Sequence, residues 1–135
     1  MTPKIKIKNL GFYYNAHPVL ENISMEIAEN RITAVSGPSG QGKSTLLMTL
    51  NRLGETIEGA RVSGRIEIRF GEKFQNIYVP GFRVSDLRRR VGMVFQTPNP
   101  LPMSIYKNVV FPLKLRGEDR QKDAAFRVET ALKKA

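Results

Sequence analysis

The segment that most constrains the fold is GPSGQGKST at residues 37–45, which fits the pattern Gly-x-x-x-x-Gly-Lys-Ser/Thr. A short apolar run, residues 32–35, precedes it, and leucines recur at helical spacing over residues 44–53. This order predicts a buried strand over residues 31–36, then a glycine-rich loop, then a helix whose N-terminal N–H groups face an anion. We call residues 37–45 the phosphate loop, because its glycines give the backbone the freedom to wrap closely around phosphate groups.

The side chains of the phosphate loop suit a nucleoside triphosphate. The Lys43 ammonium is expected to bridge the β- and γ-phosphates, and the Ser44 hydroxyl is a hard oxygen ligand for Mg²⁺. Main-chain N–H groups complete the cradle. The residues predicted to bind the nucleotide are Gly37, Ser39, Gly40, Gln41, Gly42, Lys43, Ser44 and Thr45. The alternative, a glycine-rich turn that matches by chance, is disfavoured by the strand and helix patterns on either side.

Composition narrows the function classes. The 135 residues suffice for one domain with a buried core, and the absence of cysteine excludes disulfides and cysteine ligands. No apolar run approaches about 18 residues, so we expect neither a signal peptide nor a membrane span. The net charge is +10, and the arginines are densest at residues 88–90. Because no aromatic residue is interleaved with them, a solvated face or a missing acidic partner segment is favoured over a nucleic-acid surface.

Local patterns predict the remaining elements. Antiparallel strands are expected over residues 5–14, 19–27 and 62–70, with a turn at 15–18 and a further short strand at 77–79 as a candidate. In the later part of the chain we expect a helix over 84–90 opened by Ser85, a short buried strand over 91–95 and a stiff proline-rich loop over 97–102. A second helix is expected to be capped by Ser104, kinked or interrupted by Pro112 and ended by Gly117. A further helical pattern covers residues 118–134.

Three segments together resemble the ATP-binding subunits of ABC transporters. They are the phosphate loop, the block VGMVFQ at Val91–Gln96, which is similar to the Q-loop, and Tyr14, which lies 23 residues before Gly37. The resemblance implies ATP and Mg²⁺ as cofactors. It also implies that Gln96 offers its amide oxygen to Mg²⁺ or to the attacking water, and that Tyr14 is the aromatic residue that stacks on adenine. From its spacing alone, Tyr14 is equally an ordinary strand residue. Tyr13 points to the other face of the strand and is expected in the core.

A longer run, residues 87–111, resembles the ATP-binding subunits of bacterial phosphate importers. This resemblance implies phosphate uptake, a second ATP-binding subunit as homodimer partner, and a cytoplasmic location, peripheral on the inner face of the cell membrane. It also implies that residues 97–106 contact the membrane subunits, with Met103, Ile105 and Tyr106 as apolar anchors. The alternative for this segment is an internal loop packed on its own helix.

The expected fold class is α/β: a P-loop NTPase-like core with an antiparallel β subdomain, truncated before the helical signature subdomain and the Walker B strand. Residues 1–135 are expected to form part of an ABC-type nucleotide-binding domain. Within it, residues 1–30 and 60–80 would be mainly antiparallel β, 31–55 the phosphate-loop strand and helix, and 91–135 the Q-loop and the start of the helical region.

The catalytic groups of the family pattern are incomplete in this sequence. The Leu-Ser-Gly-Gly-Gln signature, the Asp-Glu pair that ends an apolar run and the switch histidine have no match, so only Lys43 and Gln96 remain as supporting residues. We therefore expect weak nucleotide binding and negligible hydrolysis by residues 1–135 alone. The alternatives are a non-catalytic nucleotide-binding module and another P-loop NTPase or kinase.

Overall fold

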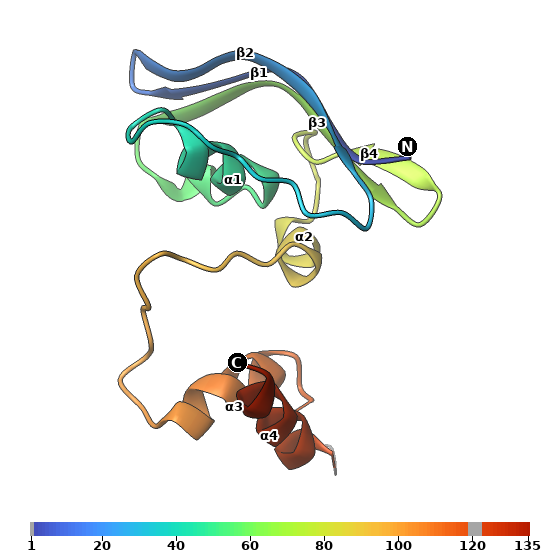
Figure 1. Cartoon of the computed structure of the whole chain (residues 1–135), viewed down its shortest axis with the longest axis vertical. Helices are drawn as coiled ribbons and strands as arrows, with labels where there is room; N and C mark the ends of the chain where they lie inside the picture. Colours follow the sequence, from blue (N-terminus) through green and yellow to red (C-terminus); the bar gives the residue numbers. More distant parts are fainter. Residues whose placement is uncertain (1, 119–122) are drawn as a thin grey trace. The chain divides into compact units, whose positions relative to one another are not determined.

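The computed structural model describes residues 2–118 and 123–135. The chain divides into two compact units, Met1–Val94 and Phe95–Ala135 (Figure 1). The described strands all lie in the first unit. This unit also holds the helices α1 (Lys43–Leu50) and α2 (Val84–Arg90) and the short 3₁₀ helix η1 (Gly54–Thr56), whereas α3 (Ile105–Leu115) and α4 (Ala124–Lys134) lie in the second.

The sheet of the first unit is antiparallel and has the strand order β2-β1-β3-β4. Its strands are β1 (Pro3–Tyr14), β2 (His17–Ala28), β3 (Ala60–Phe70) and β4 (Lys73–Asn76). The three longer strands confirm the predictions made from alternating apolar residues. The candidate strand at 77–79 is wrong, because the residues that pair with the end of β3 are 73–76. In Figure 1, α1 and α2 lie on the same side of this sheet.

A bulge in β1 decides which side chains reach the core. Ile7 is buried, as are Leu10 and Phe12, although these two have the opposite parity in the strand. The pairing register with β2 shifts between Ile7 and Leu10, where Asn9 has a φ of 50°. An extra residue in one strand moves every later side chain to the other face. The larger core around these residues consists of Leu20, Leu46, Ile66, Ile68, Ile77 and Leu87.

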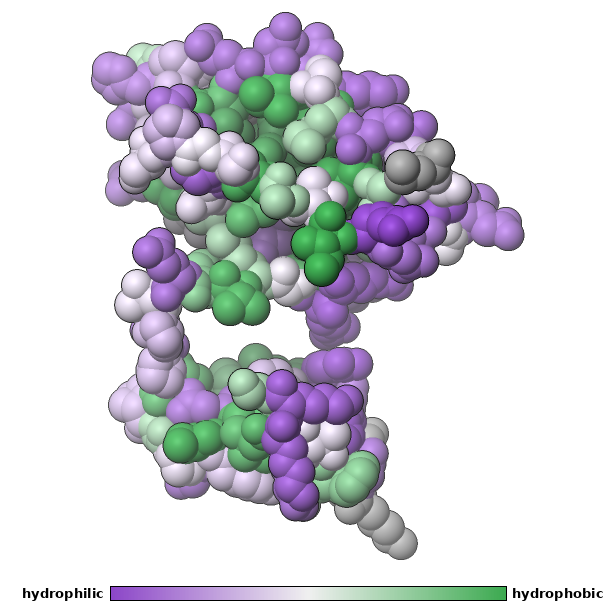
Figure 2. Space-filling view, viewed as in Figure 1, coloured by the Kyte–Doolittle hydropathy of each residue, from purple (hydrophilic) through white to green (hydrophobic). Residues whose placement is uncertain are grey.

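Two predicted strands are not strands. Residues 31–36 and 91–95 have no β-structure, and within them Ile32 is 100% exposed and Val94 97% exposed. A strand needs a neighbour to accept its N–H groups and supply its carbonyl partners. None of the four described strands pairs with either segment. These predictions were wrong because apolar sequence alone does not provide a pairing partner. Figure 2 shows hydrophobic surface interspersed among hydrophilic side chains.

The helices of the first unit differ from the predictions at their ends. α1 ends at Leu50 instead of near residue 53, because Arg52 has a φ of 58° and turns the chain out of the helix. α2 has the predicted range, Val84–Arg90, but the residue that precedes its first turn is Arg83, so Ser85 does not open it. Its residues 88–90, the densest cationic run, all contact groups within the first unit.

The second unit is a pair of helices whose start is shaped by one asparagine. The Ser104 hydroxyl accepts the Lys107 N–H at 3.3 Å, which confirms the predicted N-cap of α3. Asn108 accepts the Leu101 N–H at 2.8 Å and donates to three main-chain carbonyls, those of Leu101, Met103 and Ser104. α3 continues through Pro112 to Leu115, so Pro112 does not interrupt the helix, and the alternative, a kink at Pro112, stays a prediction.

The second helix of this unit begins later than its pattern suggested. α4 starts at Ala124, and residues 119–122 of the predicted helix lie outside the described residues. Gly117 has a φ of 70° after the end of α3, as its predicted role requires. Val110 of α3 and Val128 of α4 are buried in this unit. In the described part of the chain, no helix is long and apolar enough to cross a membrane.

Candidate functional site

The phosphate loop follows a backbone path that only glycine adopts without strain. Gly37, Gly40 and Gly42 have φ values of 148°, 80° and 79°. A Cβ at Gly37 or Gly40 would meet nothing within 4 Å, so these two positions require glycine for conformation and leave open space beside the backbone. Positive φ at Gly40 and Gly42 on either side of Gln41 makes backbone N–H groups converge, which is how a loop forms an anion-binding concavity.

The last glycine of the phosphate loop, Gly42, packs against β2 of the β1–β2 hairpin. A Cβ at Gly42 would lie 2.8 Å from Leu20 Cδ2 and 3.1 Å from the Val19 carbonyl oxygen, both in β2. Leu20 and Leu46 are buried in the same core, so the strand and the helix after the loop are held together by apolar packing. The position of the loop relative to the hairpin is therefore a tertiary property.

Helix α1 presents its N-terminal end to the loop. The Leu46 N–H donates to the Gly42 carbonyl at 2.8 Å, which is the first hydrogen bond of the helix. The N–H groups of Lys43, Ser44 and Thr45 precede this bond and have no acceptor within the helix. Thr45 is buried, whereas Ser44 is exposed. These donors and the helix dipole favour a bound anion.

The Lys43 side chain folds back over the loop. Its Nζ donates to the Gly37 carbonyl at 2.9 Å and to the Pro38 carbonyl at 2.6 Å. An ammonium group has three protons, so one remains for a further acceptor. The contacts place the positive charge of Lys43 against two carbonyls at the start of the phosphate loop and hold the two ends of the loop close together.

The loop has the groups that a polyphosphate with Mg²⁺ requires: open space at two glycines, converging N–H groups, an ammonium and an exposed Ser44 hydroxyl. Among residues 2–118 and 123–135, no group of three or more His, Asp or Glu side chains is placed to hold a metal. A Mg²⁺ ion at this loop would depend on phosphate oxygens and water together with the Ser44 hydroxyl, which suits its reluctance to lose water.

The aromatic pair in β1 is turned opposite to the prediction. Tyr14 packs on the core, with its ring centroid 4.9 Å from that of Phe12 in an edge-to-face arrangement. Tyr13 lies on the other face, where the Arg61 guanidinium is 4.6 Å from its ring centroid. The expectation that Tyr13 is the core residue was wrong, because the bulge in β1 exchanges the two faces. Tyr14 is only partly buried and lies at the strand end that pairs with His17.

Gln96 and residues 97–106, the proposed membrane-subunit contact, belong to the second unit. Gln96 is exposed, and its role beside Mg²⁺ stays a prediction. In residues 97–106, Met103, Ile105 and Tyr106 are 39%, 73% and 50% exposed. A loop packed fully on its own helix would bury these side chains, so their exposure favours an external contact.

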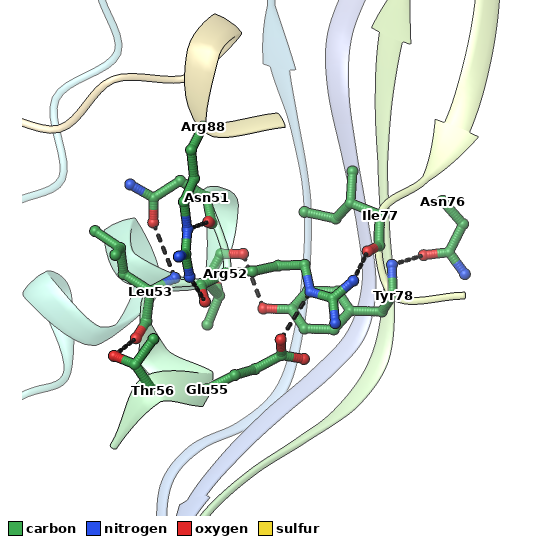
Figure 3. A network of polar contacts seen from close by, with 10 residues as sticks. Asn51, Arg52, Leu53, Glu55, Thr56, Asn76, Ile77, Tyr78 and Arg88 are labelled. Atoms are coloured by element: carbon green, nitrogen blue, oxygen red, sulfur yellow. Dashed lines mark hydrogen bonds and ion pairs between the residues drawn. The ribbon is translucent and has the colours of Figure 1, made fainter. Parts of the chain in front are cut away.

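Sequence reasoning missed a polar network at the far end of α1 (Figure 3). The Tyr78 hydroxyl donates to the Thr49 carbonyl at 2.9 Å, and Arg52 donates to the Ile77 carbonyl and to Glu55. Arg88 donates to the carbonyls of Asn51 and Arg52. The positive φ of Arg52 could not be inferred from its residue type, because glycine usually occupies such a position after a helix.

Burial raises the pKa of the Tyr78 hydroxyl well above its usual value. The negative charge of Glu55 adds to the effect, and the positive charge of Arg52 partly offsets it. The hydroxyl therefore keeps its proton and remains a donor to the Thr49 carbonyl throughout the neutral pH range. This bond holds the end of α1 opposite to the phosphate loop.

Replacing Tyr78 by Phe is expected to lower the free energy of unfolding by about 1 kcal/mol at neutral pH, because a buried hydrogen bond is lost. Since folding raises the pKa, the folded protein keeps a proton that the unfolded chain releases above about pH 10, so this stabilisation declines as pH rises past that value. Urea unfolding at pH 7 and above pH 10 measures both effects. Tyr106→Phe, at a half-exposed ring, is the control, and an equal loss in the two variants would contradict the assignment.

Comparison with known proteins agrees with this geometry. Residues 20–135 match the family model described as ABC transporter. The chain therefore belongs to the ABC transporter family. It is 48% identical over 135 residues to phosphate import ATP-binding protein PstB 2 of Nostoc sp., covering 100% of this chain and 50% of that protein. It is 46% identical over 131 residues to phosphate import ATP-binding protein PstB 1 of Vibrio parahaemolyticus, covering 97% and 47%. The chain spans about half the length of the curated relatives it matches.

The family confirms the fold class predicted from the sequence. The antiparallel sheet and the helices correspond to the N-terminal part of an ABC-type P-loop ATPase, and the chain matches one half of its relatives. The resemblance to phosphate-importer ATP-binding subunits is likewise confirmed by relatives that carry this name at 46–48% identity.

Proposed function

We propose that the chain is part of the ATP-binding subunit of an ABC importer that couples ATP hydrolysis to the uptake of inorganic phosphate. The observation that carries the proposal is the phosphate loop at the N-terminus of α1, with the Lys43 ammonium held beside unbonded N–H groups. The names of the relatives supply the transported solute. In this proposal residues 1–135 form part of one nucleotide-binding domain, with the antiparallel segments 1–30 and 60–80 placed around the phosphate loop.

Each residue of the site has a distinct task in this proposal. Lys43 neutralises the β- and γ-phosphates, and the N–H groups of the loop and of the first turn of α1 bind phosphate oxygens. Ser44 would be a Mg²⁺ ligand, and Gln96 would offer its amide oxygen to Mg²⁺ or to the attacking water. Tyr14, at the end of β1, stacks on adenine. Bound Mg²⁺ would draw charge from the terminal phosphate, which favours attack by water.

The partners follow from the same proposal. The exposed apolar residues Met103, Ile105 and Tyr106 would contact the membrane subunits of the transporter, and a second ATP-binding subunit would complete a homodimer. The protein would then work at the cytoplasmic side of the cell membrane, peripherally attached. We propose no nucleic-acid partner, since residues 88–90 are engaged within the first unit.

For residues 1–135 alone we propose weak nucleotide binding and negligible hydrolysis, because the sequence supplies no second acidic Mg²⁺ contact and no general base. Titration with ATP, in competition with GTP, tests the binding site, and phosphate release compared with a full-length relative tests hydrolysis. Undetectable binding of ATP at millimolar concentrations would refute the proposal. A small P-loop kinase is the alternative, and transfer of phosphate to an added acceptor would favour it.

Tyr14→Leu should weaken ATP binding about fivefold, since aromatic stacking contributes roughly 1 kcal/mol beyond burial. Leucine keeps apolar contact with Phe12, so the core is largely preserved. Tyr13→Leu is the matched control, because it removes a neighbouring ring that contacts Arg61 on the opposite face. Isothermal titration with ATP measures both variants. If Tyr13→Leu lowers ATP affinity more than Tyr14→Leu does, the adenine contact would be assigned to Tyr13 instead.

A further inference from the structure

The carbonyl end of α1 is closed by an unusual turn. The Leu53 N–H donates to the Met48 carbonyl at 3.0 Å, and the Arg52 N–H donates to the Thr49 carbonyl at 3.3 Å. This pair of bonds is the Schellman arrangement, which usually has glycine where this chain has Arg52 with a φ of 58°. The turn leaves the carbonyls of Asn51 and Arg52 directed away from α1, at the negative end of its dipole.

Arg88 occupies both of these carbonyls. Its Nε donates to the Asn51 carbonyl at 3.2 Å and its Nη2 to the Arg52 carbonyl at 2.8 Å (Figure 3). The neighbouring arginines of α2 have other partners. Arg89 contacts Asp86, and Arg90 lies over the Phe70 ring. One guanidinium thus connects α2 to the two residues that follow α1, which lie 36 and 37 positions earlier in the sequence.

Each of the two helices adjoins a different predicted site segment: the phosphate loop for α1, and the residues leading to Gln96 for α2. α1 begins within the phosphate loop, and its eight residues extend only about 12 Å. α2 ends at Arg90, six residues before Gln96. Leu87 of α2 and Leu46 of α1 are buried in the same hydrophobic core, so the Arg88 contact is not the only link between the two helices. A change in the order or position of α1 therefore has a direct mechanical route to the chain that leads to Gln96.

We propose that Arg88 is a positioning residue that couples the phosphate-loop helix to residues 84–94. The inference rests on the proposed function, because nucleotide binding is the event that would be transmitted. Ligand binding that suppresses opening of α1 then suppresses opening of α2 as well, since the two helices share the hydrogen bonds of one guanidinium. Arg88 touches neither nucleotide nor reacting atoms in this role.

Amide hydrogen exchange of the full chain, with and without Mg²⁺ and ATP, tests the coupling. The probes are the Leu53 N–H at the end of α1 and the Val91 N–H, which donates to the Leu87 carbonyl at 2.8 Å. With ATP at about one hundred times its Kd, amides that exchange only by opening of the unliganded state slow up to about 100-fold. We expect this slowing at both probes in the wild type and only at Leu53 in Arg88→Gln.

Arg89→Gln is the matched control, because it removes the same charge from the same turn of α2 and leaves the carbonyls of Asn51 and Arg52 occupied. It should behave as the wild type at both probes. Equal ATP-dependent slowing of Val91 in Arg88→Gln and in the wild type would overturn the proposal, as would the same loss in both variants.

A nucleotide-free comparison separates this inference from the proposed function. Without ATP, Arg88→Gln should speed exchange at Leu53 and Val91 together, whereas Arg89→Gln should not. If ATP slows no amide of the wild type but this paired effect occurs, the ATP assignment fails and the mechanical link between α1 and α2 stands. If Arg88→Gln changes exchange at Val91 alone, the link itself is refuted.

Discussion

Lys43→Met is expected to weaken ATP binding on the order of 100-fold, corresponding to about 3 kcal/mol for a lost charge-assisted hydrogen bond. Methionine keeps the apolar stem and removes the ammonium that lies over the carbonyls of Gly37 and Pro38. The effect should be nearly absent for a nucleoside without phosphates, because Lys43 is assigned to the β- and γ-phosphates. Calorimetric titration with ATP, ADP and adenosine measures this dependence directly.

The control for this prediction is Lys107→Met, which removes the same charge from an exposed residue of α3 in the second unit. It should leave ATP affinity within about twofold of the wild type at physiological salt, where interactions between exposed charges are screened. Denaturant unfolding of Lys43→Met should stay close to that of the wild type, since the lost contacts lie in an exposed loop. If Lys43→Met binds ATP with wild-type affinity, the assignment of the phosphate loop as the nucleotide-binding site would be refuted.

Gly42→Ala is expected to lower the free energy of unfolding by about 2–5 kcal/mol. Two costs add: left-handed φ for a residue with a Cβ costs roughly 1–2 kcal/mol, and forcing a methyl group into packed atoms costs roughly 1–3 kcal/mol. The Cβ would approach Leu20 Cδ2 to 2.8 Å and the Val19 carbonyl to 3.1 Å. Because β2 would have to move away from the start of α1, urea unfolding should show the loss even without nucleotide.

Gly40→Ala separates the two costs. Gly40 has almost the same φ, 80° against 79°, but its Cβ would meet nothing within 4 Å. It should therefore show the conformational cost alone, about 1–2 kcal/mol. If the free energy of unfolding falls equally in both variants, the contact between Gly42 and β2 does not contribute to stability. The inference that the hairpin positions the phosphate loop would then be wrong.

The tyrosines of β1 show where sequence reasoning reached its limit. Alternation predicted the strand, and spacing selected Tyr14, but the face of each ring depended on a bulge between Ile7 and Leu10. Nothing in the local pattern marks that bulge, because Asn9 adopts its φ of 50° as part of pairing with two other strands. The burial of Tyr14 against Phe12 followed from the sheet, and the expectation for Tyr13 was reversed.

The segments 31–36 and 91–95 show the opposite limit. Their apolar residues are typical of buried strands, yet Ile32 and Val94 are almost wholly exposed. Propensity raises the chance that a segment pairs, but pairing itself requires a second strand at hydrogen-bonding distance. The Ser104 cap succeeded as a prediction because its partner, the Lys107 N–H, is three residues away and every element of the contact is local.

By itself the sequence indicated three glycines followed by Lys43 and Ser44 at the start of a helix, the three longer strands and the N-cap of α3. The loop and the cap depend on contacts within a few residues, and the strands are marked by local alternation of apolar residues. Only the tertiary structure decided that β2 supports Gly42, that Tyr14 faces the core and that Arg88 closes the end of α1. The reason is physical, because each of these contacts joins residues distant in the chain whose approach is set by the packing of the whole unit.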